Sequence, residues 1–269
     1  MPYSLDAPVI KNVKFPNHNY LVSLRAPKVA QQALPGQFVM AAQVDDSSIP
    51  YPLLRRALAV YSTTQEDGEK SIINLLLKIV GDGTLRLASL EKDDTVNLIG
   101  PLGNSFNTVH NTSRKHFLVA GGIGIASFYL LAEQLRQKNQ EVHLIYGGQT
   151  ADDLVGLEDF QKLDIPVCVT TNDGSQGFKG LVTEGLEIYL QKVPYDNLTI
   201  YTCGPTPMMK AVSDLAAHHS IACQISVEAK MACGFGVCLG CSVKTTDTYR
   251  LACQHGPIFD ASEFIWENE

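Results

Sequence analysis

The pattern of apolar and polar positions divides the chain near residue 108. Up to that point, short apolar or alternating runs are separated by turn-rich pieces, and this spacing predicts a small antiparallel β-sandwich or barrel. The runs are Tyr20–Leu24, Phe38–Ala42, Leu58–Tyr61, Ser71–Val80 and Thr95–Ile99. The polar stretch Asn107–Lys115 then predicts a linker, and we expect a domain boundary there, after residue 108.

After this linker, apolar runs alternate with segments of helical periodicity. The expected strands are His116–Ala120, Val142–Tyr146, Val167–Thr171 and Leu198–Thr202, and the expected helices are Ala126–Lys138, Leu157–Lys162, Thr183–Leu190 and Pro207–His218. Strands that alternate with helices predict a parallel sheet with helical crossovers. The last piece, residues 223–269, is too small to bury a core of its own, so a metal centre would be its natural organiser.

Composition narrows the class of protein. The chain has 269 residues, of which 45% are hydrophobic, and its net charge is −7. Such a chain lacks the clustered basic face that nucleic acids require, and it has no polybasic stretch for anionic lipid. The uncharged segment Phe117–Ala132 contains glycines and is shorter than the ~20 apolar residues that span a bilayer. The N-terminus has no signal-peptide pattern, so we expect a soluble cytoplasmic protein.

The seven cysteines provide the most specific chemical signal. Four of them, Cys233, Cys238, Cys241 and Cys253, lie close together near the C-terminus. The spacing C-x4-C-x2-C, followed by a distant fourth cysteine, is that of plant-type [2Fe–2S] ferredoxins. A zinc site is the alternative, but zinc ribbons pair two short CxxC knuckles and this segment has one such spacing. An odd number of cysteines without a secretion signal argues against a disulfide framework.

Two turns between a predicted strand and a predicted helix are candidate nucleotide sites. In the first, Gly122 and Gly124 fit a dinucleotide fingerprint whose third glycine is replaced by Ser127. A tight turn without a ligand explains this motif equally well. In the second, Cys203 and Gly204 follow a strand where open α/β sheets bind ligands, and a small thiol leaves space for a planar ring. The alternative for Cys203 is a buried structural cysteine.

In the first domain, a basic pair and a glycine-containing turn together indicate a phosphate site. Arg55 and Arg56 precede one apolar run, and Gly83 and Thr84 follow another. An arginine beside glycine and threonine amides suits a diphosphate. A pair of arginines is more often a solvated surface feature, so this motif alone leaves both interpretations open.

Taken in order, these motifs resemble those of the ferredoxin-reductase superfamily over nearly the whole chain. The motifs are Leu54–Arg56, Gly81–Thr84, Gly100–Asn104, Gly121–Gly124, Cys203–Pro205, Met231–Gly234 and Cys253–Asp260. Within the superfamily, the chain resembles the electron-transfer subunit of NAD-dependent (class B) dihydroorotate dehydrogenase. The resemblance implies a six-stranded antiparallel FAD-binding barrel over residues 1–108, a Rossmann-like NAD-binding domain with a parallel sheet over 109–222, and a small [2Fe–2S] domain over 223–269.

The resemblance also assigns residues to three cofactors. For FAD it implies Arg56, Ala57, Leu58, Ala59, Leu76, Leu77, Lys78, Gly83 and Thr84. For NAD it implies Gly122, Gly124 and Gly204, with Cys203 as the catalytic residue, and for the cluster it implies Cys233, Cys238, Cys241 and Cys253. Ala57 and Ala59 depart from the Arg-Pro-x-Ser motif of the family, so a proline and a hydroxyl expected near the flavin are missing.

The activity that the resemblance implies is electron transfer in de novo pyrimidine (UMP) biosynthesis. A catalytic partner subunit with FMN oxidises dihydroorotate, and electrons pass through the cluster and FAD to NAD+. Nothing in the sequence resembles the FMN barrel, so this chain alone should not oxidise dihydroorotate. The implied assembly is a heterotetramer with two copies of each subunit, and the partner docks at the cysteine loop.

Two other functions remain open. One is a subunit of another reductase, such as an NAD(P)H:ferredoxin oxidoreductase or a sulfide dehydrogenase. Those relatives typically have an aspartate among the cluster ligands, whereas all four candidates here are cysteines. The other is a non-enzymatic binding module that is stapled by zinc.

Overall fold

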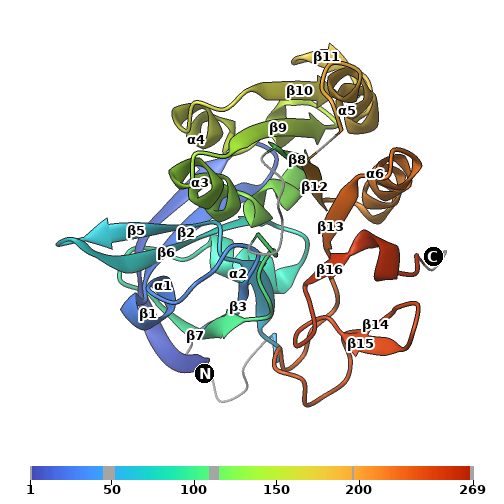
Figure 1. Cartoon of the computed structure of the whole chain (residues 1–269). Helices are drawn as coiled ribbons and strands as arrows, with labels where there is room; N and C mark the ends of the chain where they lie inside the picture. Colours follow the sequence, from blue (N-terminus) through green and yellow to red (C-terminus); the bar gives the residue numbers. More distant parts are fainter. Residues whose placement is uncertain (1, 45–51, 109–114, 196, 267–269) are drawn as a thin grey trace.

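The computed structural model describes residues 2–44, 52–108, 115–195 and 197–266, and two large sheets dominate it (Figure 1). The first sheet is antiparallel, with the strand order β4-β3-β7-β1-β2-β6-β5. Its strands are β1 (Tyr3–Phe15), β2 (Asn19–Arg25), β3 (Phe38–Gln43), β4 (Arg56–Ala59), β5 (Ser62–Glu66), β6 (Glu69–Lys78) and β7 (Thr95–Leu102). Two short helices, α1 (Pro27–Ala30) and α2 (Asp82–Ala88), pack against this sheet.

The first sheet follows directly from its apolar pattern. Every second residue of β7 is buried, beginning with Val96 and Leu98, because successive side chains of a strand point to opposite faces. These side chains meet Val22, Leu24 and Ile73 in one apolar cluster. The inner face of the sheet is therefore a hydrophobic core of its own.

The number of strands differs from the six that the resemblance implies, because the sheet has seven. β4 and β5 are separated by only Val60 and Tyr61, yet they form the two opposite edges of the sheet. The Tyr61 amide donates to the Asn74 carbonyl in β6, while the Val60 amide donates to the Gln37 carbonyl next to β3. One continuous segment thus bridges both edges of a barrel-like sheet and contributes two of its seven strands.

The second sheet has the order β11-β10-β9-β8-β12-β13-β16, and all neighbouring pairs are parallel except β13 with β16. Its strands are β8 (Lys115–Gly121), β9 (Glu141–Gly148), β10 (Val167–Thr171), β11 (Phe178–Lys179), β12 (Leu198–Cys203), β13 (Ala222–Ser226) and β16 (Ile258–Asp260). The central strands β8 and β12 are almost continuously buried, as expected for parallel strands covered on both faces.

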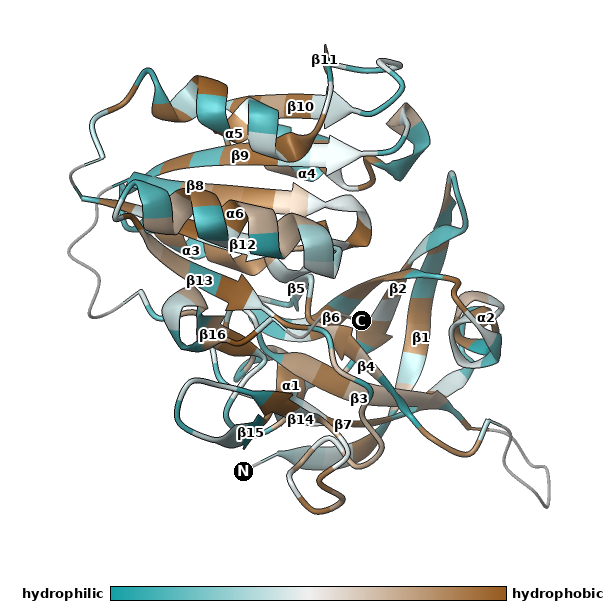
Figure 2. Cartoon of the chain, turned by 90° about the vertical axis from the view of Figure 1, so that its right-hand side faces the viewer, coloured by the Kyte–Doolittle hydropathy of each residue, from teal (hydrophilic) through white to brown (hydrophobic). Residues whose placement is uncertain are grey.

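Helices cover the two faces of this sheet (Figures 1 and 2). Helices α3 (Tyr129–Gln137) and α4 (Leu157–Lys162) contribute to one apolar cluster, and α5 (Val182–Leu190) and α6 (Thr206–His218) contribute to another. Three 3₁₀ helices, η1 (Gly122–Ser127), η2 (Ala151–Asp153) and η3 (Ala261–Glu263), complete the fold. No helix in the described part of the chain is both long and apolar enough to cross a membrane.

The C-terminal segment is an excursion from the second sheet. The chain leaves β13, forms the cysteine loop and the hairpin of β14 (Ser242–Lys244) with β15 (Tyr249–Leu251), and returns as β16 to pair with β13. The expected division between residues 222 and 223 therefore falls inside a strand of the parallel sheet. Most of the expected linker, residues 109–114, lies outside the described residues.

Candidate functional site

A cavity of about 270 Å³ lies between the barrel and the parallel sheet. It brings together the predicted residues Arg56, Ala57, Leu58, Ala59, Leu76, Leu77, Lys78 and Thr84 from the barrel with Gly124 and Cys203 from the parallel sheet. Apolar side chains such as Phe38, Ile123 and Met231 form other parts of its wall. An apolar cavity with few polar groups suits a planar aromatic ligand, and we call it the barrel cavity.

The two adjacent arginines have different environments. The Arg55 guanidinium donates to the Asn97 side chain, 2.5 Å away, whereas Arg56 lines the barrel cavity. Gly83 lies directly against the Arg56 guanidinium, because a Cβ atom at this position would overlap with it. Of the two arginines, Arg56 is thus the one that lines the barrel cavity, and Gly83 provides the space for its side chain.

Thr84 shapes the turn beside Arg56. Its hydroxyl accepts hydrogen bonds from the amides of Val80 and Gly81 and donates to the Gly81 carbonyl at 2.9 Å. The hydroxyl is therefore engaged by the chain itself. Thr84 fixes the start of α2 next to the cavity, and a phosphate contact from this residue would come from its backbone.

A second cavity of about 650 Å³ opens at the carboxyl ends of β8, β9, β10 and β12. The predicted residues Gly122, Gly124 and Gly204 line it. Gly124 packs so closely on the end of β12 that a Cβ atom would overlap with the Cys203 carbonyl. Glycine-rich strand ends of a parallel sheet are a common nucleotide site, and we call this one the strand-end cavity.

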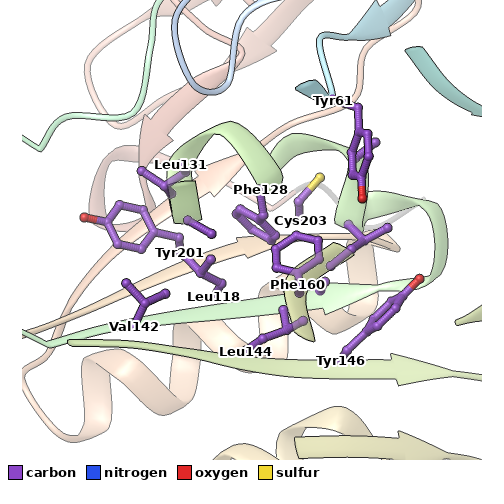
Figure 3. Packing of buried hydrophobic residues seen from close by; sticks show 14 of the residues in the cluster. Tyr61, Leu118, Phe128, Leu131, Val142, Leu144, Tyr146, Phe160, Tyr201 and Cys203 are labelled. Carbon is purple, nitrogen blue, oxygen red and sulfur yellow. The ribbon is translucent and has the colours of Figure 1, made fainter. Parts of the chain in front are cut away.

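Cys203 lies at the end of β12, between the two cavities. Its side chain lines the barrel cavity, whereas the next residue, Gly204, lines the strand-end cavity. The Cys203 thiol is 3.5 Å from the Ser127 hydroxyl and packs in the apolar cluster of Figure 3. Burial and the charge of Glu228 raise its pKa to about 12. Cys203 therefore remains a neutral thiol at neutral pH.

An ion pair joins the barrel to the parallel sheet beside both cavities. The Lys78 ammonium lies 3.0 Å from Asp153 Oδ1, and the amides of Gln149 and Thr150 donate to Asp153 Oδ2. Burial alone would raise the pKa of Asp153, but hydrogen bonds from Lys78 and Asn17 outweigh it and lower the pKa. The charge of Lys78 is thus committed to a contact between the two sheets.

The four predicted ligands of the cysteine loop lie as two pairs. Cys241 and Cys253 are buried, with their sulfur atoms 3.2 Å apart, and the Gly236 amide donates to the Cys253 sulfur. Cys233 and the exposed Cys238 form the outer pair, in which the Cys238 amide donates to the Cys233 sulfur at 3.5 Å. Burial raises the pKa of Cys233, but hydrogen bonds from the backbone amides of Cys238, Phe235 and Val237 outweigh burial and lower the pKa to about 6.

This arrangement bears on the type of metal centre. In the described part of the chain, no three His, Cys, Asp or Glu side chains converge as ligands of a single metal ion. Two thiolate pairs, one buried and one at the surface, suit a cluster with two irons, each held by two cysteines. Backbone amides that donate to the sulfur atoms are the outer contacts such a cluster needs.

Exposed apolar side chains lie in the cysteine loop and on the hairpin that follows it. Phe235, Val237 and Leu239 lie within the loop and are 46%, 72% and 61% exposed. Tyr249 on β15 is 62% exposed. Large apolar side chains with this exposure are typical of a protein-binding surface. We call these four residues the loop surface.

Sequence reasoning missed Glu228, which lines both cavities. It lies two residues beyond the end of β13. An acidic residue just beyond the carboxyl end of a parallel strand is a signal that could have identified it. Asp153 was also missed as a site residue, because its partner Lys78 is distant in the sequence.

Models of known families match two parts of the chain. Residues 118–214 match the NAD-binding domain of oxidoreductases, and residues 228–265 match the iron–sulfur cluster binding domain of dihydroorotate dehydrogenase B. The first match covers most of the lining of the strand-end cavity, and the second covers the cysteine loop. The fold and both matches together define an oxidoreductase of the ferredoxin-reductase type.

Two relatives identify the family to which the chain belongs within this class of oxidoreductases. The dihydroorotate dehydrogenase B (NAD(+)) electron transfer subunit of Clostridium acetobutylicum is 35% identical over 257 residues, which are 96% of this chain and 95% of that protein. A homologue of this subunit from Aquifex aeolicus is 34% identical, over 97% and 98% of the two chains. The chain therefore belongs to the family of dihydroorotate dehydrogenase B electron transfer subunits.

Among solved structures, an NADH-dependent reduced ferredoxin-NADP oxidoreductase, described for flavin-based electron bifurcation, has the same fold. The TM-score is 0.85 and the identity 29%, over 97% of this chain and 90% of that one. The expected combination of a barrel, a parallel sheet and a C-terminal iron–sulfur segment is thus confirmed.

Proposed function

We propose that this chain is the electron-transfer subunit of an NAD-dependent dihydroorotate dehydrogenase in de novo pyrimidine (UMP) synthesis. It accepts electrons from the FMN of a catalytic partner subunit and delivers them to NAD+ through a [2Fe–2S] cluster and FAD. The supporting observation is the order of the three sites in one chain. Met231 lines the barrel cavity two residues before Cys233, and the barrel cavity shares Gly124 and Glu228 with the strand-end cavity.

The proposed roles follow this order. Cys233, Cys238, Cys241 and Cys253 hold the cluster, the barrel cavity holds FAD with Arg56 on its diphosphate, and the strand-end cavity holds NAD. FAD supplies the conversion between single electrons and hydride, which neither of the other two groups performs alone. Cys203 is the proposed catalytic residue, and as a neutral thiol it provides a small wall where the two rings meet.

The proposed partner binds at the loop surface. The outer pair, Cys233 and Cys238, is the part of the cluster site that a second protein can approach, because Cys241 and Cys253 are buried. The proposed assembly contains two copies of each subunit. The proposed location is the cytoplasm.

Purified protein tests the proposed cofactors directly. The chain should show the absorption bands of flavin and of a [2Fe–2S] cluster, with iron and acid-labile sulfide in equal amounts. Colourless protein that contains zinc would contradict the proposal. It would favour a non-enzymatic binding module that is stabilised by zinc.

A charge on the loop surface should weaken partner binding. In Val237→Glu, the new carboxylate would have to be buried at the interface, so we expect a loss of about 2 kcal/mol, which is roughly 30-fold in affinity. Calorimetric titration with the FMN-containing subunit measures this loss. Phe178→Glu on β11 adds the same charge at the far edge of the parallel sheet and should bind normally. Equal affinity of the two variants would place the partner elsewhere.

The similarity to a ferredoxin-NADP oxidoreductase favours a second candidate, a subunit of another reductase. That candidate predicts electron exchange with ferredoxin in place of the FMN subunit. The complete set of four cysteines supports the first proposal, because the alternative relatives typically have an aspartate in the set. Rates with each partner, measured on the same preparation, distinguish the two functions.

A further inference from the structure

Glu228 is the titratable group with free oxygen atoms where the two cavities meet. Four residues line both cavities, namely Lys78, Ile123, Gly124 and Glu228. Lys78 is paired with Asp153. Glu228 forms no ion pair and no side-chain hydrogen bond with any residue that the structure describes.

The backbone holds Glu228 at this junction. β13 ends at Ser226, and the Val227 amide then donates to the Pro257 carbonyl at 2.9 Å. Ser226 is buried and its hydroxyl lies 3.4 Å from that of Ser127, next to Cys203. The Glu228 side chain is open to the cavities. Partial desolvation by the surrounding protein raises its pKa above the ordinary glutamate value.

The proposed function creates a demand for protons at this point. A hydride consists of one proton and two electrons, and electrons that arrive through the cysteine loop bring no protons. Each NAD+ that becomes NADH therefore requires one proton from another source. Two single electrons, one proton and NAD+ balance to one NADH.

We propose that Glu228 donates this proton in the barrel cavity and regains one from solvent through the open side of the cavities. This inference rests on the proposed function. The carboxyl gives its proton to the reduced flavin as the electrons arrive, becomes a carboxylate, and is protonated again before the next pair of electrons.

The other titratable groups that face the cavities are poor donors. Arg56 keeps its proton throughout. Lys78 is engaged in its ion pair with Asp153, whose own pKa is lowered by the hydrogen bonds from Lys78 and Asn17. The buried Cys203 thiol, with a pKa of about 12, also retains its proton. Glu228 is therefore the acid in the described part of both cavities whose carboxyl is unpaired and reached by solvent, so it can release and regain a proton.

The test compares two ways of reducing the flavin in the isolated chain. Dithionite delivers electrons without protons, whereas NADH delivers a hydride that carries its own. In Glu228→Gln, we expect flavin reduction by dithionite to slow about 100-fold, the lower end of general acid effects. Flavin reduction by NADH in a single turnover should change far less. Proton uptake, followed with an indicator dye, should slow together with the dithionite reaction.

Matched variants make the result specific. Glu187→Gln removes the same charge from an exposed position on α5 and should leave both reactions unchanged. Glu228→Asp retains an acid set back by one methylene group, so it should slow only the dithionite reaction and by less than Glu228→Gln. If Glu228→Gln does not retain FAD, this aspartate variant carries the test.

Two results would overturn the proposal. Wild-type rates in both reactions would show that Glu228 donates no required proton. A slower NADH reaction with a normal dithionite reaction would show that Glu228 orients the nicotinamide. Because these measurements need no partner subunit, they are separate from the proposed function itself, which fails if the purified chain binds no flavin.

Discussion

Replacing Cys241 with serine should remove the cluster and reduce dihydroorotate-driven NAD+ reduction to background, while NADH-dependent reduction of artificial dyes continues. Cys241 belongs to the buried pair, and its sulfur lies 3.2 Å from that of Cys253. Serine fits this space, but a hydroxyl does not ionise as a thiol does, so it is a much poorer ligand for iron than the cysteine thiolate. The barrel and strand-end cavities remain intact, so the path from NADH to flavin should survive.

Iron content, the visible spectrum and both rates measure this prediction. The matched control is Cys223→Ser, because Cys223 is equally buried but lies outside the cysteine loop, where Ser213 is a hydrogen-bond partner. The control should retain the cluster and both activities. A Cys241→Ser variant that still couples dihydroorotate to NAD+ would contradict the assigned electron path.

Replacing Arg56 with alanine should cause the largest loss of FAD affinity in the barrel cavity. Hydrogen bonds between a guanidinium and a diphosphate are charge-assisted, and losing them costs about 1.5–3 kcal/mol, or roughly 10- to 150-fold in affinity. Titration of the flavin-free protein with FAD measures this change. The cluster bands should be unaffected.

Arg55→Ala is the control for this prediction. It removes the same charge one residue earlier, but its guanidinium bonds to Asn97 outside the barrel cavity. FAD affinity should therefore remain within about threefold of wild type, since a surface substitution changes free energy by about 0.5 kcal/mol. Equal losses in both variants would show that general electrostatics, and not a contact from Arg56, hold the cofactor.

The cysteine loop and the alternating strands and helices could be predicted because their signals are local in the sequence. The spacing of Cys233, Cys238 and Cys241 sits within one short loop, and the fourth cysteine follows nearby. Helix periodicity likewise depends on neighbouring residues, although the turn after Gly121 is a 3₁₀ helix and α3 begins only at Tyr129.

Features that depend on distant contacts could not be predicted in this way. The residue pattern alone treats Arg55 and Arg56 alike, although the family resemblance selects Arg56. In the structure, contacts with Asn97 and Gly83 give the two side chains different environments. β1 was not predicted as a strand, because charged residues such as Lys11 interrupt its apolar pattern. In the structure it pairs with both β2 and β7.

The position of Glu228 between the two cavities also depends on distant contacts. In the sequence it is one acid between Val227 and Ala229. Its position between two cavities arises because β13 joins the parallel sheet and places its carboxyl end beside β12. The lining of both cavities therefore depends on a strand of the parallel sheet that leads into the cysteine loop.

The most direct measurement of the proposed function uses the assembled complex. The chain is mixed with an FMN-containing dihydroorotate dehydrogenase subunit, and dihydroorotate and NAD+ are added without oxygen. NADH should form in equal amount to orotate, and neither subunit alone should form it. A complex that reduces acceptors through its FMN but never reduces NAD+ would contradict the proposed role of this chain.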